Sequence, residues 1–183
     1  MNTNDQLGRT LKAIKRDLEY AYVGAAQASV TGNATTARKM TSLINQISTD
    51  VDAGSNAADE LTEAKLLTAG QTAYTNGSDP TVFMIPPGKA QVLAGFSAAS
   101  GRNREISQGK TLVNVIDLYV SPYGEYKVVL NRHMLASVAL LIDPTMFKQC
   151  VLRPFSRTLL AKTGDADTHM VVGEYSCKHT NFG

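Results

Sequence analysis

Residues 116–132 read IDLYVSPYGEYKVVLNR, and this stretch decides the fold because two apolar runs flank a turn. β-branched and aromatic residues are common in both runs, so we expect strands over Leu112–Val120 and Glu125–Leu130. Between them, Ser121-Pro122-Tyr123-Gly124 carries the proline and glycine that are typical of a tight turn. The stretch therefore predicts a β-hairpin.

Further strands are expected on both sides of this hairpin. Thr81–Ile85 is short and apolar and is closed by two prolines, which is typical of a strand buried on both faces. Val138–Ile142 shows a similar pattern. Toward the C-terminus we expect strands over Cys150–Phe155 and Met170–Lys178, with residues 163–167 as the turn between them.

The N-terminal segment is predicted to be a helix of about five turns. Asn4 or Asp5 is the expected cap at its start, and Gly24 lies near its end. Its apolar stripe has members three or four residues apart: Leu7, Leu11, Ile14, Leu18 and Tyr22. The basic residues off the stripe indicate either a face toward an anionic partner or an ordinary solvated face; they are Arg9, Lys12, Lys15 and Arg16.

A second helix is expected from about Glu63 to Thr75. Thr62 is a plausible N-cap, and Asn76-Gly77 is a stop signal. A short helix should follow Pro86-Pro87 and run through Leu93.

The less regular parts of the chain are rich in small and polar residues. We expect residues 25–54 to form loops around one short helical turn near Leu43–Ile47, and residues 97–110 to form a polar loop. Helices thus come first and strands dominate the end of the chain. This order predicts an α+β fold rather than regular β-α alternation.

Composition excludes several classes of protein. The 183 residues are 43% apolar and 19% charged with a net charge of +2, which fits a globular chain and is too little charge for whole-protein attraction to nucleic acid. No apolar run is long enough for a membrane span, and we expect no signal peptide. Cys150 and Cys177 are expected to be reduced thiols, with a single disulfide as the alternative.

The candidate catalytic and metal-binding motifs each fail a requirement. Lys89 follows Pro87-Gly88, but Ala90 stands where a phosphate loop needs Ser or Thr. Cys177 and His179 alternate on an expected strand and could contact one zinc, yet no second ligand pair is spaced for it.

The remaining histidines and aspartates do not form a pattern either. Nothing near His133 or His169 in the sequence supplies a nucleophile and an orienting acid. Asp143, Asp165 and Asp167 lie in expected turns, where aspartates usually bond their own backbone. We therefore expect no catalytic, cofactor-binding or metal-binding residue and no enzyme.

Several blocks of the chain resemble a subfamily of tailed-phage major head proteins, which is similar to the Hong Kong 97-like capsid fold. The blocks in the C-terminal half are residues 116–132, 141–144, 152–155, 160–167 and 173–175. The N-terminal blocks are residues 11–19, 34–40 and 61–64. The first of these resembles the long spine helix of that family.

This resemblance implies an arrangement in lobes. Residues 1–58 would hold the spine helix and following loop of a peripheral lobe. Residues 59–145 would form an axial mixed α/β lobe with helices around a small sheet, and residues 146–183 would return as strands to the peripheral lobe. From the resemblance we expect this chain to lack the family's N-terminal arm and extended loop, which clasp neighbouring subunits.

The resemblance also implies a function, namely a structural subunit that self-associates into capsomers and an icosahedral shell around a bacteriophage genome. Its partners would be other copies of itself, scaffolding, portal or decoration proteins, and packaged DNA on the inner face, with no membrane and no small-molecule substrate. Assembly would take place in the host cytoplasm, and the loop at residues 97–110 would become ordered on self-association. Two alternatives stay open: a virion-associated or soluble binding module of related fold, and a small hydrolase in which His133, His169 and an aspartate meet in a cleft.

Overall fold

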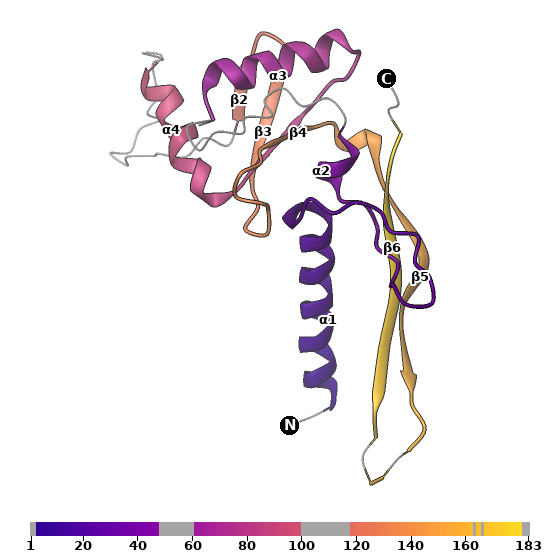
Figure 1. Cartoon of the computed structure of the whole chain (residues 1–183). Coiled ribbons are helices and arrows are strands. Elements are labelled where there is room, and N and C mark those ends of the chain that lie inside the picture. The colour runs from indigo at the N-terminus through magenta and orange to yellow at the C-terminus, as the bar shows by residue number, and fades with distance from the viewer. Residues whose placement is uncertain (1–2, 48–60, 100–117, 163, 166, 181–183) are drawn as a thin grey trace, which may run out of the picture.

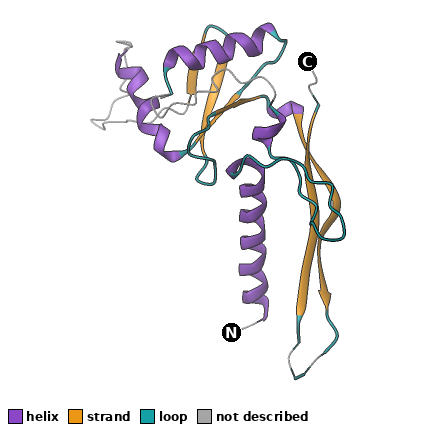
Figure 2. Ribbon diagram, in the orientation of Figure 1, coloured by secondary structure: helices purple, strands orange, loops and turns teal. Residues whose placement is uncertain are grey.

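The computed structural model describes residues 3–47, 61–99, 118–162, 164–165 and 167–180 (Figure 1). Helices precede the first strand of a four-stranded sheet, a further helix lies between the first and second strands along the chain, and a long two-stranded hairpin follows the sheet (Figure 2). Helix and strand are mixed without regular alternation, which confirms the α+β class.

The first helix, α1 (Thr3–Glu19), continues into a π-helical turn, η1 (Tyr20–Gly24). The helix already begins at Thr3, so Asn4 and Asp5 lie inside its first turn and the prediction that one of them caps it was wrong. Asp5 instead places a negative charge near the N-terminal end of the helix dipole, which is favourable there. The end near Gly24 was predicted correctly.

A loop with one isolated bridge, between Val30 and Lys39, leads to the short helix α2 (Leu43–Gln46). Ser42 caps α2 by accepting a hydrogen bond from the Asn45 backbone amide, and its side chain is fully buried. The expected helical turn in this region is confirmed.

The next helix, α3 (Glu63–Thr75), matches the expected bounds. Thr62 accepts a hydrogen bond from the Lys65 amide at 3.3 Å, and the chain leaves the helix through Asn76 and Gly77, the latter with φ of +76°. Gly70 lies where α3 approaches the sheet, because a Cβ at this position would clash with the hydroxyl of Tyr126.

The sheet has the order β2-β3-β1-β4. The central pair is β1 (Val82–Ile85) and β3 (Gly124–Leu130), which run parallel, while β2 (Leu118–Ser121) and β4 (Leu140–Ile142) pair antiparallel at the edges. The hairpin predicted from residues 116–132 is therefore β2–β3. Residues 112–117 lie outside the described residues.

A crossover links the parallel strands. It begins with a 3₁₀ turn, η2 (Pro87–Lys89), and α4 (Ala90–Ala99). We expected this helix to end near Leu93, but it continues to Ala99, because alanine-rich sequence favours helix over the predicted loop. The expected loop over residues 100–110 lies outside the described residues.

Both faces of β1 are packed, as predicted. One cluster joins Phe83 and Ile85 to Leu66 of α3, Leu93 of α4 and the stacked rings of Tyr119 and Tyr126. A second cluster on the other face joins Val23 of η1 to Met134 and Leu140, with Met84 packed against it. The second cluster ties the end of the first helix to the sheet.

The C-terminal hairpin consists of β5 (Phe147–Leu159) and β6 (His169–His179), which follow the short turn η3 (Pro144–Met146). Both strands are longer than the sequence predicted. They pair only with each other in the described structure. In Figure 1 the hairpin and α1 project from the rest of the molecule in the same direction.

Candidate functional site: the C-terminal hairpin

The hairpin is the most exposed regular element of the described chain. Nearly every residue of β5 is exposed, on both faces of the strand. Several large apolar side chains on the hairpin face solvent: Val151, Leu152, Leu159, Leu160 and Met170, with Leu152 73% exposed. A ribbon of this kind, about 44 Å long and with both faces of β5 largely exposed in the described structure, is marginally stable alone.

The hydrogen-bonding pattern shows which backbone groups of the hairpin are free. The Leu160 amide donates to the Thr168 carbonyl at one end, and the Thr180 amide donates to the Met146 carbonyl at the other. Inward and outward residues alternate along an antiparallel ladder, so even-numbered residues of β6 bond to β5. The odd-numbered ones point their N–H and C=O groups outward: His169, Val171, Gly173, Tyr175 and Cys177.

The outer edge of β5 is interrupted in its middle. Pro154 has no amide hydrogen, and the Phe155 amide donates to the hydroxyl of Tyr175 at 3.1 Å. Two register shifts, between Val151 and Arg153 and between Arg153 and Ser156, also distort the strand there. Proline and bulges are features that prevent an edge strand from pairing with another chain.

A few contacts attach the upper end of the hairpin to the N-terminal segment. The Gln149 side-chain amide donates to the Tyr22 hydroxyl at 3.2 Å, and the Gln46 side-chain amide donates to the Cys177 carbonyl at 3.4 Å. Burial raises the pKa of Tyr22, the Gln149 hydrogen bond lowers it, and the thiols of Cys177 and Cys150 raise it further. Burial, followed by the neighbouring Cys150, likewise raises the pKa of Cys177.

The two thiols are free in this structure. Cys177 lies opposite Gln149, whereas Cys150 lies opposite Ser176. Because successive side chains of a strand point to opposite faces, the register does not place these two cysteines face to face.

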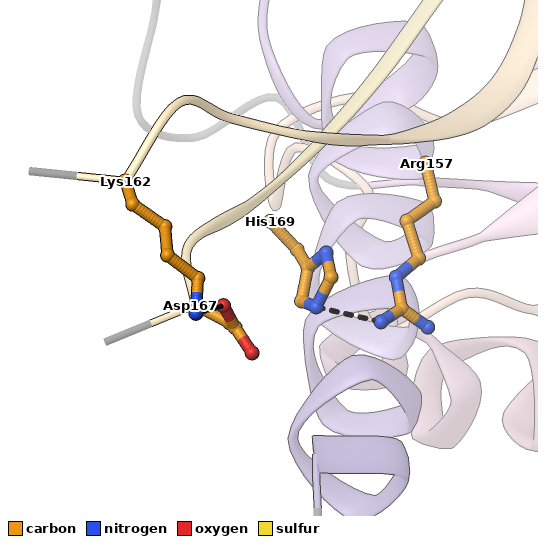
Figure 3. Close-up of polar contacts among 4 residues, drawn as sticks. All are labelled: Arg157, Lys162, Asp167 and His169. Carbon is orange, nitrogen blue, oxygen red and sulfur yellow. Dashed lines mark hydrogen bonds and ion pairs between the residues drawn. The ribbon is translucent and has the colours of Figure 1, made fainter. Parts of the chain in front are cut away.

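Polar contacts stabilise the far end of the hairpin (Figure 3). The Arg157 guanidinium lies 2.7 Å from Nε2 of His169, and Lys162 forms an ion pair with Asp167 at 3.0 Å. Since a guanidinium only donates, Nε2 of His169 accepts and Nδ1 carries the proton. That Nδ1 is buried without a hydrogen-bond partner.

The apolar stripe of α1 is also incompletely covered. Leu7, Leu11, Ile14 and Leu18 are only partly buried, and the four basic residues predicted beside them are exposed. Glu19 at the end of α1 accepts a hydrogen bond from the Asn131 side chain at 2.6 Å. The helix is thus attached at its C-terminal end, and most of its length has room for further contacts.

The candidate chemical residues have local structural contacts. Asp143 caps η3 through Thr145, whose amide and hydroxyl donate to it at 2.9 and 2.7 Å. The ring of His179 stacks on Phe147, and the backbone of His133 bonds to Asn131 in the turn after β3. His169 contacts Arg157 on the hairpin. Among the described residues no three side chains of histidine, cysteine, aspartate and glutamate gather into one group that could hold a metal ion, and none of the contacts described above joins His133 and His169 to an aspartate.

Lys89 lies in the single turn before α4. Among the described residues there is no cluster of histidine, cysteine, aspartate and glutamate that could hold a metal ion. None of the helices in the described ranges is long and apolar enough to cross a membrane.

The hairpin surface was missed at the sequence level, although one signal pointed to it. Pro154 lies inside the expected strand Cys150–Phe155, and a proline within a strand marks an edge. Combined with Leu152, it indicated an exposed apolar edge.

Two comparisons with known proteins indicate the family to which the chain belongs. The chain is similar to the major capsid protein of Escherichia phage Phieco32, with 30% identity over 122 residues. This match covers 65% of the chain and 35% of the relative, so the chain spans about a third of that protein. A family model described as SU10 major capsid protein matches residues 1–182.

These matches define the class of the protein, a structural viral protein of bacteriophages that forms part of a capsid. Within this class, the chain belongs to the SU10 major capsid protein family.

Proposed function

We propose that this chain self-associates into capsomers that build an icosahedral shell around the phage genome, and that it carries out no catalysis. We assign it a Hong Kong 97-like arrangement in which α1 is the spine helix. Residues 1–58 and 146–183 would form the peripheral lobe and residues 59–145 the axial lobe.

The observation that carries the proposal is the bare hairpin β5–β6. Leu152, Leu159 and Met170 are exposed on a ribbon that has no third strand in the described structure. Covering one such side chain contributes about 1.5–3 kcal/mol, and symmetry repeats each contact in a shell. Contacts with neighbouring copies would therefore stabilise an element that is marginal alone.

Electron microscopy of the full gene product, expressed alone and with its scaffolding protein, tests the proposal. Closed particles are expected. A monodisperse monomer that binds a different chain would instead support the alternative of a soluble or virion-associated binding module.

A substitution links particle formation to the hairpin. Leu152→Asp should weaken association by at least tenfold, because it places a charge in a contact that association would bury. Tyr74→Asp is the matched control, since Tyr74 is a similarly exposed apolar residue, at 65%, on α3. Equal association of the two variants would contradict a role for the hairpin.

Further partners follow from the same proposal. The basic side of α1 would face packaged DNA without sequence preference, and scaffolding, portal or decoration proteins would join the shell in the host cytoplasm. Replacing Lys12 and Lys15 with glutamine should reduce the salt dependence of DNA binding by the assembled particles. An unchanged salt dependence would indicate an ordinary solvated face.

A further inference from the structure

We propose that the outer edge of β6, from His169 to Tyr175, pairs antiparallel with the same edge of a second copy of this chain. This inference rests on the proposed function and deepens it by assigning one contact between copies. The surface is a backbone edge, and its partner is an identical strand related by a two-fold axis.

The edge is available in the described structure. The alternation along β6 directs the backbone groups of His169, Val171, Gly173 and Tyr175 away from β5. No hydrogen bond to these outward groups is present in the described parts of the chain. An added strand would satisfy them, which is the general mode of β-augmentation.

The other edges among the described strands are poor partners. Pro154 and the register shifts interrupt β5, and the Phe155 amide is already bonded to Tyr175. The edge strands β2 and β4 of the four-stranded sheet contain only 4 and 3 residues. By contrast, β6 has 11 residues and no proline, so its most suitable partner on a second copy is β6 itself.

The register of this pairing follows from what is occupied. The Cys177 carbonyl already accepts from Gln46, so the pairing should end before it. A two-fold axis at Val172 meets this condition, because it pairs Val171 with Gly173 and His169 with Tyr175 across the axis.

Charge is compatible with the same register. Glu174 is the only acidic or basic side chain, apart from the histidine, between residues 169 and 177, and it forms an ion pair with Arg153 at 3.4 Å. Opposite Glu174 the second copy presents Met170. Like charges directly opposite each other would destabilise a strand pair, and this register avoids them.

Hydrogen exchange of individual amides tests the edge without any mutation. The outward amides of Val171, Gly173 and Tyr175 should exchange at least tenfold more slowly in associated chains or assembled particles than in the dilute monomer. The outward amides of Arg157 and Leu159 on β5 are the internal control and should be unchanged. Equal protection of both sets, no change at β6, or no association at any concentration would overturn the pairing.

Cysteine crosslinking tests the register. In a Cys150→Ser, Cys177→Ser background, Val172→Cys should form an intermolecular disulfide. The two-fold axis brings the Cα atoms of the two copies of this residue within about 4.5–5.5 Å of each other. Val171→Cys is the matched control and should not crosslink, because its partner is Gly173.

The outcomes separate this inference from the proposed function. Closed particles with an unprotected β6 edge would overturn the pairing and leave the capsid function standing. A Val172→Cys crosslink in a full gene product that never forms closed particles would support the pairing and contradict the capsid function. Protection of the edge already present in the monomeric full gene product would show that a segment of the same polypeptide occupies it, which also overturns the pairing.

Discussion

The contact between Gly70 of α3 and Tyr126 of β3 allows a quantitative test of the core. Tyr126 is 0% exposed, and its hydroxyl is buried without a hydrogen-bond partner. A Cβ added at Gly70 would clash with this hydroxyl, whereas the next ring atom, Cζ, is 3.4 Å away, at the limit of ordinary contact. The steric conflict therefore resides almost entirely in one oxygen atom.

Two effects oppose each other in Gly70→Ala. Replacing a glycine inside a helix with alanine stabilises by about 1 kcal/mol, while overpacking a core costs about 1–3 kcal/mol. We expect a net loss of about 1 kcal/mol in the free energy of unfolding. Tyr126→Phe alone should change stability by less than about 1 kcal/mol, because the hydroxyl it removes has no partner.

The double variant should reverse the sign of the alanine substitution. With the hydroxyl removed, Gly70→Ala should stabilise by about 1 kcal/mol, which gives a coupling energy of about 2 kcal/mol between the two positions. Urea unfolding followed by circular dichroism measures each corner of the cycle. Gly95→Ala on α4 is the matched control, because nothing lies within 4 Å of its added Cβ.

The reasoning would be refuted by additive effects, that is, by a coupling energy near zero. It would equally fail if Gly70→Ala were as stabilising as Gly95→Ala in the otherwise unchanged chain.

Three further predictions concern the caps and the hairpin. Thr62→Ala should lower the free energy of unfolding by about 1 kcal/mol in urea titrations, because it removes the N-cap of α3, and no change would contradict that role. Tyr175→Phe should increase amide exchange at Phe155, whose bond to the hydroxyl it deletes, while unaltered exchange would show that the bond is dispensable. Iodoacetamide should alkylate the exposed Cys150 faster than Cys177, because the raised pKa of Cys177 favours the neutral thiol, and equal rates would contradict this. The contribution of the neutral Cys177 thiol to the free energy of unfolding should be present below pH 9 and be lost as pH rises through the raised pKa, so a free energy of unfolding that does not change at alkaline pH would also count against it.

The sequence predicted best those elements whose ends have specific local chemistry. Thr62 and Asn76 bound α3 as expected, and Pro86 ends β1. The end of α4 was harder to predict, because Ser97 and its neighbours are small residues that fit both helix and loop.

Long-range features were outside the reach of local patterns. The parallel pairing of β1 with β3 joins Val82 to Lys127, and no short-range signal specifies such a partner. The length of β5 was underestimated because Lys148, Arg157 and other polar residues interrupt the apolar run. Such residues are compatible with a strand only when its faces are exposed.

The proposed association surface was difficult to predict for the same reason. Residues of the types that catalysis or metal binding requires, such as His133 and Asp143, form hydrogen bonds with residues two positions away in the chain. An association surface consists of repeated apolar and backbone groups, and it becomes visible only when the three-dimensional structure shows that nothing covers them.

The proline and the register shifts of β5 also limit how many copies a hairpin can join. A ribbon with two competent edges has a valence of two and can add strands without end, as cross-β fibrils do. A ribbon with only one edge able to form strand–strand hydrogen bonds can pair with one other copy, so strand pairing ends at two copies. With the pairing proposed for β6, Pro154 would let two hairpins associate through one edge without offering a second edge on which a sheet could grow.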